Sequence, residues 1–171
     1  MRRLSSTGVI VIAAFVFSAV AFAVAHESKN FGAPLSGDEE VPPVDTKARG
    51  NSILHLSKSG DELRFKLIVA NIENVTQAHI HCGAEGVNGP VVVFLFPLTP
   101  AGVTANGVLS EGTLTNADII PRPSSVECPG GVANLDELIA KLRSGDAYVN
   151  AHTIANPGGE IRGQVREHGP S

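Results

Sequence analysis

Two histidines lie one residue apart in the stretch QAHIHC, residues 77–82. Residues i and i+2 of a β-strand project from the same face, so His79 and His81 are expected to project together with Gln77. Two imidazoles at that spacing can both reach one metal ion. Cys82 is expected on the opposite face, and the stretch therefore favours a histidine site over a mixed Cys–His ligand set.

A third histidine occupies residues 147–153 (AYVNAHT), where Tyr148, Asn150 and His152 alternate with apolar residues. If the fold places this strand beside residues 75–82, the three imidazoles of His79, His81 and His152 converge and leave one coordination position open. A nitrogen-rich ligand set favours copper and, after copper, zinc. The sequence therefore predicts a mononuclear copper or zinc site.

The last predicted strand, residues 160–165, adds two charged candidates. Glu160 is predicted to be a ligand or the hydrogen-bonding partner of a ligand, and Arg162 to steer anions towards the metal. Gln77 is predicted to support the site in a similar way. The alternative is that Glu160 and Arg162 form an internal network that braces the hairpin, while the histidines are polar residues that only order loops.

The N-terminus has the layout of a secretory signal peptide, residues 1–25. Arg2 and Arg3 precede an uncharged apolar run, residues 8–25, which ends in the small-residue pattern Ala23-Val24-Ala25. The alternative is an uncleaved membrane anchor formed by residues 8–25. Both predict that the remaining chain lies outside the cytoplasm, as a secreted, periplasmic or surface protein.

The charge balance and the two cysteines narrow the function further. Removal of residues 1–25 leaves 11 basic and 17 acidic side chains, a net charge of −6 with neutral histidines. No Lys/Arg cluster is available to neutralise phosphates, which excludes nucleic acid as a partner. The two cysteines of an exported chain most simply form one disulfide, Cys82–Cys128, and the alternative is a pair of free thiols.

Alternating or apolar runs separated by Gly and Pro predict a series of short strands. They cover residues 52–57, 63–70, 75–82, 91–96, 107–113, 147–153 and 160–165. The stretch VVVFLF, residues 91–96, is apolar on both faces and is predicted to be a central strand. A proline-rich excursion, residues 97–131, is predicted to be held down by Cys128, and residues 166–171 form a tail.

One segment has helical periodicity. Asn134 can cap a helix, Gly145 can end it, and four apolar residues share a face between them: Leu135, Leu138, Ile139 and Leu142. The predicted fold class is therefore all-β, a Greek-key-like antiparallel β-sandwich with one short amphipathic helix. Asp38-Glu39-Glu40 is predicted to be an acidic turn before a stiff extended segment, residues 41–44, and calcium binding is the alternative.

Three stretches resemble the signature blocks of the CHRD domain, the module named for chordin. They are LSGDEEVPPVDTKARG, AHIHCGAEGVNGPVVVFL and DAYVNAHTIANPGGEIRGQV, at residues 35–50, 78–95 and 146–165. The resemblance covers residues 31–165 in the order of the family. It implies an all-β extracellular module that binds a protein partner, without catalytic activity, and it makes His79, His81 and His152 part of the family motif.

The sequence also has a more remote likeness to copper/zinc superoxide dismutase, in which a His-x-His strand and a distant third histidine hold copper. Arg162 would then guide superoxide. The bridging histidine and the zinc-loop ligands have no counterpart in this sequence. The sequence thus predicts a secreted or surface-tethered binding module with a copper or zinc ion, and leaves two alternatives: a copper redox enzyme, or a structural or protein-binding module without metal.

Overall fold

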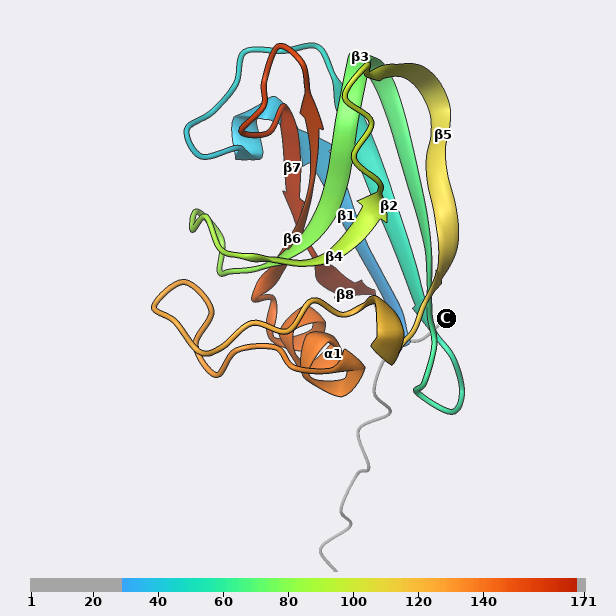
Figure 1. Cartoon of the computed structure of the whole chain (residues 1–171), viewed down its shortest axis with the longest axis vertical. Coiled ribbons are helices and arrows are strands. Elements are labelled where there is room, and N and C mark those ends of the chain that lie inside the picture. The colour runs from blue at the N-terminus through green and yellow to red at the C-terminus, as the bar shows by residue number, and fades with distance from the viewer. Residues whose placement is uncertain (1–28, 169–171) are drawn as a thin grey trace, which may run out of the picture.

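The computed structural model describes residues 29–168, and the predicted signal segment lies outside the described residues (Figure 1). Within the described part of the chain, no helix is long and apolar enough to cross a membrane. The prediction of an all-β fold with one short helix is confirmed. The strands are β1 Asn30–Ser36, β2 Arg49–Leu56, β3 Leu63–Cys82, β4 Val91–Phe96, β5 Val103–Leu114, β6 Ala147–Thr153, β7 Ile161–Gln164 and β8 Arg166–His168. The helical segments are η1 Gly37–Glu39, η2 Asn116–Asp118 and α1 Leu135–Ser144.

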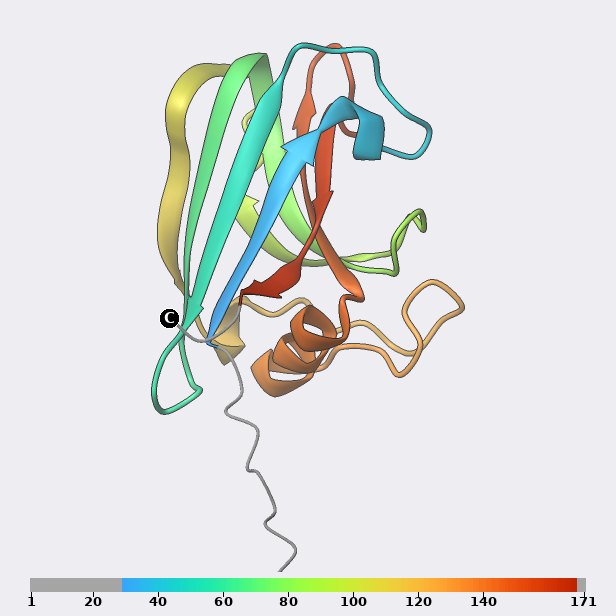
Figure 2. The same ribbon diagram turned by 180° about the vertical axis from the view of Figure 1, so that it is seen from behind.

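The strands form two facing layers that share β3 (Figures 1 and 2). The first half of β3 pairs with β2 and β5, and β2 continues to β1 and β8. The second half of β3 pairs with β6 and β4, and β6 continues to β7. A single pairing, Ser36 with Arg162, joins β1 to β7 at one side of the sandwich.

A bend in β3 lets the strand leave one layer and enter the other. The sequence predicted two separate strands here, whereas the structure has one strand of 20 residues. Asn71 and Asn74 lie at the bend with positive φ angles of 54° and 53°. Asparagine tolerates this left-handed conformation better than most residues, so the strand turns without ending.

The apolar core lies between the two layers. The first layer contributes buried side chains at alternate positions: Phe31, Ala33 and Leu35 of β1, Leu54 and Leu56 of β2, and Leu67 and Val69 of β3. The inner face of the second layer consists of Ala78, Ile80, Cys82, Ala147, Val149, Ala151 and Ile161. Because side chains alternate along a strand, the outer face of this second layer carries the polar residues of β3, β6 and β7. The core therefore fixes which side chains appear on the opposite face.

The prediction that residues 91–96 form a central strand was wrong. Among the described strands, β4 pairs with β3 alone and forms the edge of its layer. Its apolar character has two sources: Val92 and Val93 face buried surroundings, while Phe94 packs edge-on against the His79 ring at a centroid distance of 4.6 Å. The outer edge of β4 is covered at one end, where the Ile120 amide donates to the Val92 carbonyl.

Two strands were not predicted from the sequence. β1 contains Gly32 and Pro34, which weaken the strand signal, yet it pairs with β2 over seven residues. β8 occupies the first part of the expected tail and pairs with β1. Both strands are stabilised by pairing with distant partners, and a local pattern carries little information about such pairing.

The helix α1 forms where the sequence predicted it. The Asn134 side chain accepts a hydrogen bond from the Glu137 amide at 2.9 Å, and Gly145 ends the helix with a φ of 76°, which glycine adopts without strain. Its four apolar residues are buried against the sandwich. The helix closes the end of the molecule that lies opposite the bend of β3 (Figure 1).

The predicted disulfide is present between Cys82, the last residue of β3, and Cys128, in the excursion that leads to α1. The two residues are 46 positions apart, and both are fully buried. The bridge therefore ties the excursion to the strand that carries His79 and His81.

Removal of this disulfide is expected to lower the free energy of unfolding by about 4 kcal/mol, because an unbridged loop of this length gains conformational freedom in the unfolded chain. Urea denaturation of the Cys82→Ala/Cys128→Ala variant measures the loss. The wild-type protein denatured with a reductant is the matched control and should lose a similar amount. An unchanged denaturation midpoint in both would contradict a stabilising role.

Candidate metal centre

The three predicted ligands come from adjacent strands of the second layer. β3 and β6 pair so that His79 lies opposite Asn150 and His81 lies opposite Tyr148. β6 and β7 pair so that Asn150 lies opposite Arg162. The polar outer face is nevertheless buried: His79, His81 and His152 expose 3%, 8% and 7% of their surface. The loop of residues 83–90 covers part of this face, since its carbonyls accept hydrogen bonds from His81 and Arg162.

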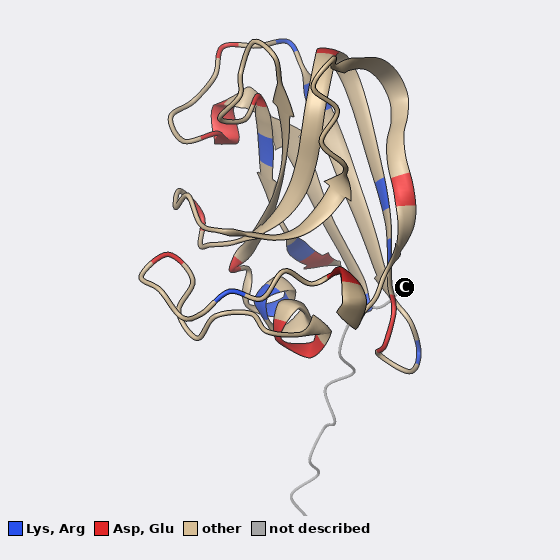
Figure 3. Cartoon of the chain, in the orientation of Figure 1, with Lys and Arg blue, Asp and Glu red and all other residues tan. Residues whose placement is uncertain are grey.

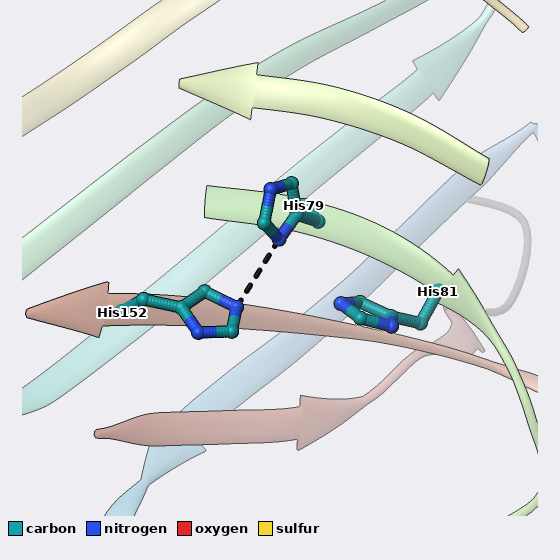
Figure 4. A group of neighbouring side chains, drawn as sticks. All are labelled: His79, His81 and His152. Atoms are coloured by element: carbon teal, nitrogen blue, oxygen red, sulfur yellow. Dashed lines mark hydrogen bonds between the residues drawn. The ribbon is translucent and has the colours of Figure 1, made fainter. Parts of the chain in front are cut away.

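The three imidazoles converge, as the strand pattern predicted (Figure 4). Nδ1 of His79 lies 3.1 Å from Nε2 of His152. One nitrogen from each of the three rings can be chosen so that all lie within 4.8 Å of one another. Two nitrogens bound to one tetrahedral ion at bonds of about 2.0–2.1 Å are separated by roughly 3.3 Å. The His79–His152 pair is thus already near the separation of two ligands of one metal.

Backbone carbonyls fix the tautomers of two of the rings. Nδ1 of His81 lies 2.8 Å from the Gly89 carbonyl, and Nδ1 of His152 lies 3.0 Å from the Pro157 carbonyl. A carbonyl only accepts, so each Nδ1 carries the proton and each Nε2 carries a lone pair when the ring is neutral. Histidine ligands of metals are commonly oriented by a hydrogen bond of this kind on their second nitrogen.

The lone pairs outnumber the protons available to them. Nε2 of His152 has two neighbours at 3.1 Å, His79 Nδ1 and Asn150 Oδ1, but a neutral His152 has no proton left on this nitrogen. The Asn150 oxygen cannot donate to it. In addition, Nε2 of His79 and Nε2 of His81 are buried without a hydrogen-bond partner. A cation that accepts several nitrogen lone pairs would satisfy this arrangement.

The pKa values of the three rings keep them neutral near pH 7. Burial lowers the pKa of His79 to about 3, and the charges of His152 and His81 lower it further in the same direction. Burial lowers the pKa of His81 to about 4 against the opposing hydrogen bond to Gly89, and burial lowers the pKa of His152 as well. Since a metal binds the neutral imidazole, the site needs no deprotonation at neutral pH.

A stack of three side chains supports His81 from one side. The His81 ring is stacked on Tyr148 with a centroid distance of 4.6 Å, and the Arg162 guanidinium lies 3.5 Å from the centroid of the same Tyr148 ring. Arg162 exposes only 2% of its surface and donates to three acceptors of the covering loop: Asn88 Oδ1, the Ala84 carbonyl and the Val87 carbonyl. Arg162 therefore anchors the covering loop over the polar face.

The other predicted supporting residues lie around the site in different roles. Both Glu160 oxygens accept hydroxyl protons, from Thr46 at 2.7 Å and from Thr153 at 2.6 Å, so Glu160 connects the loop after η1 to the end of β6. Gln77 is half-buried and lies opposite His152 in the β3–β6 pairing. The contacts of Glu160 and Arg162 match the bracing network that was the alternative for these residues.

Several contributors were not identified from the sequence. Tyr148 and Asn150 were placed on the correct face, but the stack on His81 depends on the pairing register of three strands. The carbonyls of Gly89 and Pro157 belong to loops, and their backbone oxygens leave no signal in the residue types. The sequence indicated only that polar residues alternate along residues 148–152, and the structure shows that these residues are buried.

The low pKa values predict that acid destabilises the metal-free protein. The unfolded histidines take up protons near pH 6.5, whereas His79 and His81 do so at about 3 and 4 in the folded state, so the unfolded chain binds more protons between these values. Glu40, whose pKa burial raises to about 7, acts in the opposite direction between about pH 4.5 and 7. We expect the three histidines to outweigh it, and the free energy of unfolding to fall from about pH 6.5 to pH 4.

Urea denaturation in the presence of a chelator measures this dependence. His79→Gln should flatten it, whereas His55→Gln should not, because His55 is exposed on β2. The same slope in His79→Gln and wild type would show that this ring does not carry the effect.

Arg162→Lys is expected to destabilise the protein by about 2–3 kcal/mol, because an ammonium cannot stack flat on Tyr148 while serving three acceptors. Hydrogen exchange of the loop amides, residues 84–89, should accelerate. Arg166→Lys is the matched control: this exposed arginine pairs with Glu85 in the same loop, and exposed ion pairs contribute about 1 kcal/mol or less. Equal effects of the two variants would refute the anchoring role of Arg162.

Comparison with known proteins identifies the family. A family model described as the CHRD domain matches residues 31–165. A curated relative, Chordin from Xenopus laevis, is 26% identical over 137 residues, which cover 77% of this chain and 12% of that protein. The chain thus spans about an eighth of the length of this relative. No solved structure was found to match the chain. Since the family model matches most of the sequence, the chain belongs to the CHRD domain family.

Proposed function

We propose that this protein is an extracellular CHRD binding module that holds one copper or zinc ion through His79, His81 and His152. One observation carries the metal site: three buried neutral imidazoles converge, and Nε2 of His79 and Nε2 of His81 have no hydrogen-bond partner. The extracellular location is supported by the signal-like N-terminus and by the buried Cys82–Cys128 disulfide.

The donor set favours copper and zinc over harder ions. Imidazole nitrogen suits both metals, whereas magnesium and calcium prefer oxygen ligands. When bound, the ion would supply a Lewis-acidic centre, or a one-electron redox centre if it is copper. His81 and His152 would present Nε2 to it, since their Nδ1 protons are held by the carbonyls of Gly89 and Pro157.

The proposed binding function concerns the module as a whole. The matched relative is a much longer protein named Chordin, and this chain corresponds to one segment of it. A sandwich whose covering loop, residues 83–90, is held by the hydrogen bonds of Arg162 is suited to present a fixed surface to a partner protein. The ion would then stabilise this face by linking β3 to β6.

A copper redox enzyme resembling superoxide dismutase is a second candidate. The His-x-His strand with a third histidine favours it. The placement of Arg162 does not, because its guanidinium is buried and all three acceptors that it contacts belong to the covering loop. The third candidate is a metal-free module in which His81 and His152 brace the loops through their carbonyl contacts.

Metal analysis of protein purified without a histidine tag tests the proposal. We expect about one copper or zinc ion per chain after reconstitution and dialysis, and a rise in melting temperature with metal. His81→Ala and His152→Ala should both lose the ion, and His55→Ala, on the exposed face of β2, should retain it. Failure of the wild-type protein to bind either metal would eliminate both metal-dependent candidates.

Assay of superoxide dismutation with the copper-loaded protein separates the remaining candidates. We expect no activity above that of the His81→Ala variant, since the Arg162 guanidinium is buried beneath the covering loop and is not exposed to contact the anion. Activity that follows copper content would instead favour the redox enzyme.

A further inference from the structure

Two adjoining cavities form a cleft between the loop that follows η1 and the loop that joins β6 to β7. Their volumes are about 380 and 250 Å³. Both are lined by Val44, Ala155 and Asn156, which makes the cavities neighbours. We call this pair of cavities the acidic cleft, since its lining includes four carboxylates: Glu40, Asp45, Glu73 and Glu160.

Glu40 lines the smaller cavity and is the most unusual of the four. It exposes only 5% of its surface, and its Oε1 atom is buried without a hydrogen-bond partner. Its carboxylate lies directly against Gly159, where an added Cβ would approach Oε1 to 2.4 Å. No Lys or Arg of the described residues forms an ion pair with it, and its pKa is raised because burial outweighs the more distant charge of Arg162. A backbone hydrogen bond from Val41 also acts on the carboxyl group, so the unmet need is at Oε1, and a buried oxygen without a partner is costly and indicates a missing cation or donor.

Glu160 lines the larger cavity and is also almost buried, with 9% of its surface exposed. Both of its oxygens accept from neutral threonine hydroxyls, and none of the described cationic side chains contacts it. Asp45 and Glu73 lie at the exposed part of the same cavity. The cleft thus concentrates negative charge that the described part of the chain does not neutralise.

Basic residues lie beside the cleft but not in its lining, since Arg49 donates to the carbonyl of Thr46, a lining residue. Of the residues that line the two cavities, none is Lys or Arg. Figure 3 shows acidic positions on η1 and on the neighbouring loops. The whole chain has a net charge of −4, so its general field has the same sign. Long-range and local electrostatics both favour a positively charged ligand.

The spacing of the carboxylates argues against a single metal ion. Among the described residues, His79, His81 and His152 form the one group of His, Cys, Asp or Glu close enough to share an ion. The carboxylates of the cleft do not meet this requirement. A guanidinium or ammonium group on a flexible side chain can instead contact separate acceptors, and asparagine oxygens in the lining add further ones.

We propose that the acidic cleft binds a basic segment of a partner protein, with arginine or lysine side chains seated towards Glu40 and Glu160. The elongated pair of cavities accommodates two such side chains, one in each. This inference rests on the binding-module part of the proposed function and is independent of the metal site.

Fluorescence anisotropy with a labelled hexapeptide of alternating arginine and glycine tests the proposal, at an ionic strength of about 0.15 M to limit non-specific attraction. The same peptide with citrulline in place of arginine is the neutral control. We expect the arginine peptide alone to bind. Glu40→Gln should weaken it at least tenfold, and so should Asp45→Asn, an exposed change that leaves the packing intact. Glu111→Gln is the matched control, because this exposed glutamate on β5 pairs with Lys66 of β3 and does not line the cleft.

Backbone NMR of the full chain locates the bound peptide. We expect chemical-shift changes in residues 40–46 and 154–160, and His81→Ala should bind the peptide as the wild type does. Absence of peptide binding overturns the inference, as does equal weakening by Glu111→Gln. Shifts of the same residues with calcium but not with the peptide would also overturn it. His81 does not line the acidic cleft, so peptide binding by His81→Ala, which loses a predicted metal ligand, distinguishes a failure of the metal proposal from a failure of this one.

Discussion

The burial of a polar sheet face is the constraint on which the rest of this structure depends. The outer face of β3, β6 and β7 carries imidazoles, a phenol, an amide and a guanidinium, and each is at least nine-tenths buried. Burial of such groups without partners is unfavourable by several kcal/mol. The loop of residues 83–90 solves most of this problem, because its carbonyls accept from Arg162, His81 and Tyr148. The polar face and its covering loop therefore require each other.

The hydrogen bonds of this polar face leave the histidine cluster incompletely paired. Arg162 donates to three acceptors of the loop, and the Nδ1 proton of His81 is donated to a fourth. Between His79, His152 and Asn150 there are more lone pairs than protons. Nε2 of His79 and Nε2 of His81 lack partners where three rings have been brought together by strand register, and Gln164 Oε1 on β7 also lacks one. Buried nitrogens without hydrogen-bond partners, next to groups that have partners, indicate a site that a ligand completes.

Much of the fold and part of the site could be predicted from the sequence. Strand alternation placed His79, His81 and His152 on polar faces, and the proximity of β3 and β6 then followed from the architecture. Helix α1 was predictable because its caps and apolar face are local signals. The edge position of β4 and the pairing of β1 were not, since both depend on which distant strand is available. A bracing role was the stated alternative for Arg162, but its partners were not predictable, because they are mostly backbone atoms of a loop.

The loop between β6 and β7 contacts both the histidine cluster and the acidic cleft. Pro157 in this loop accepts the proton of His152, while Thr153, at the end of β6, donates to Glu160. Pro157 therefore belongs to both, since its carbonyl binds His152 and the residue lines the acidic cleft. Both regions favour positive charge, so cations at the two places would repel each other through a partly buried segment where salt screens weakly. Glu40 and Glu160 line the cleft close to this loop. Their negative charges reduce the repulsion between the two cations. The β6–β7 loop thus connects two regions that favour cations, the histidine cluster and the acidic cleft, through its contacts with each.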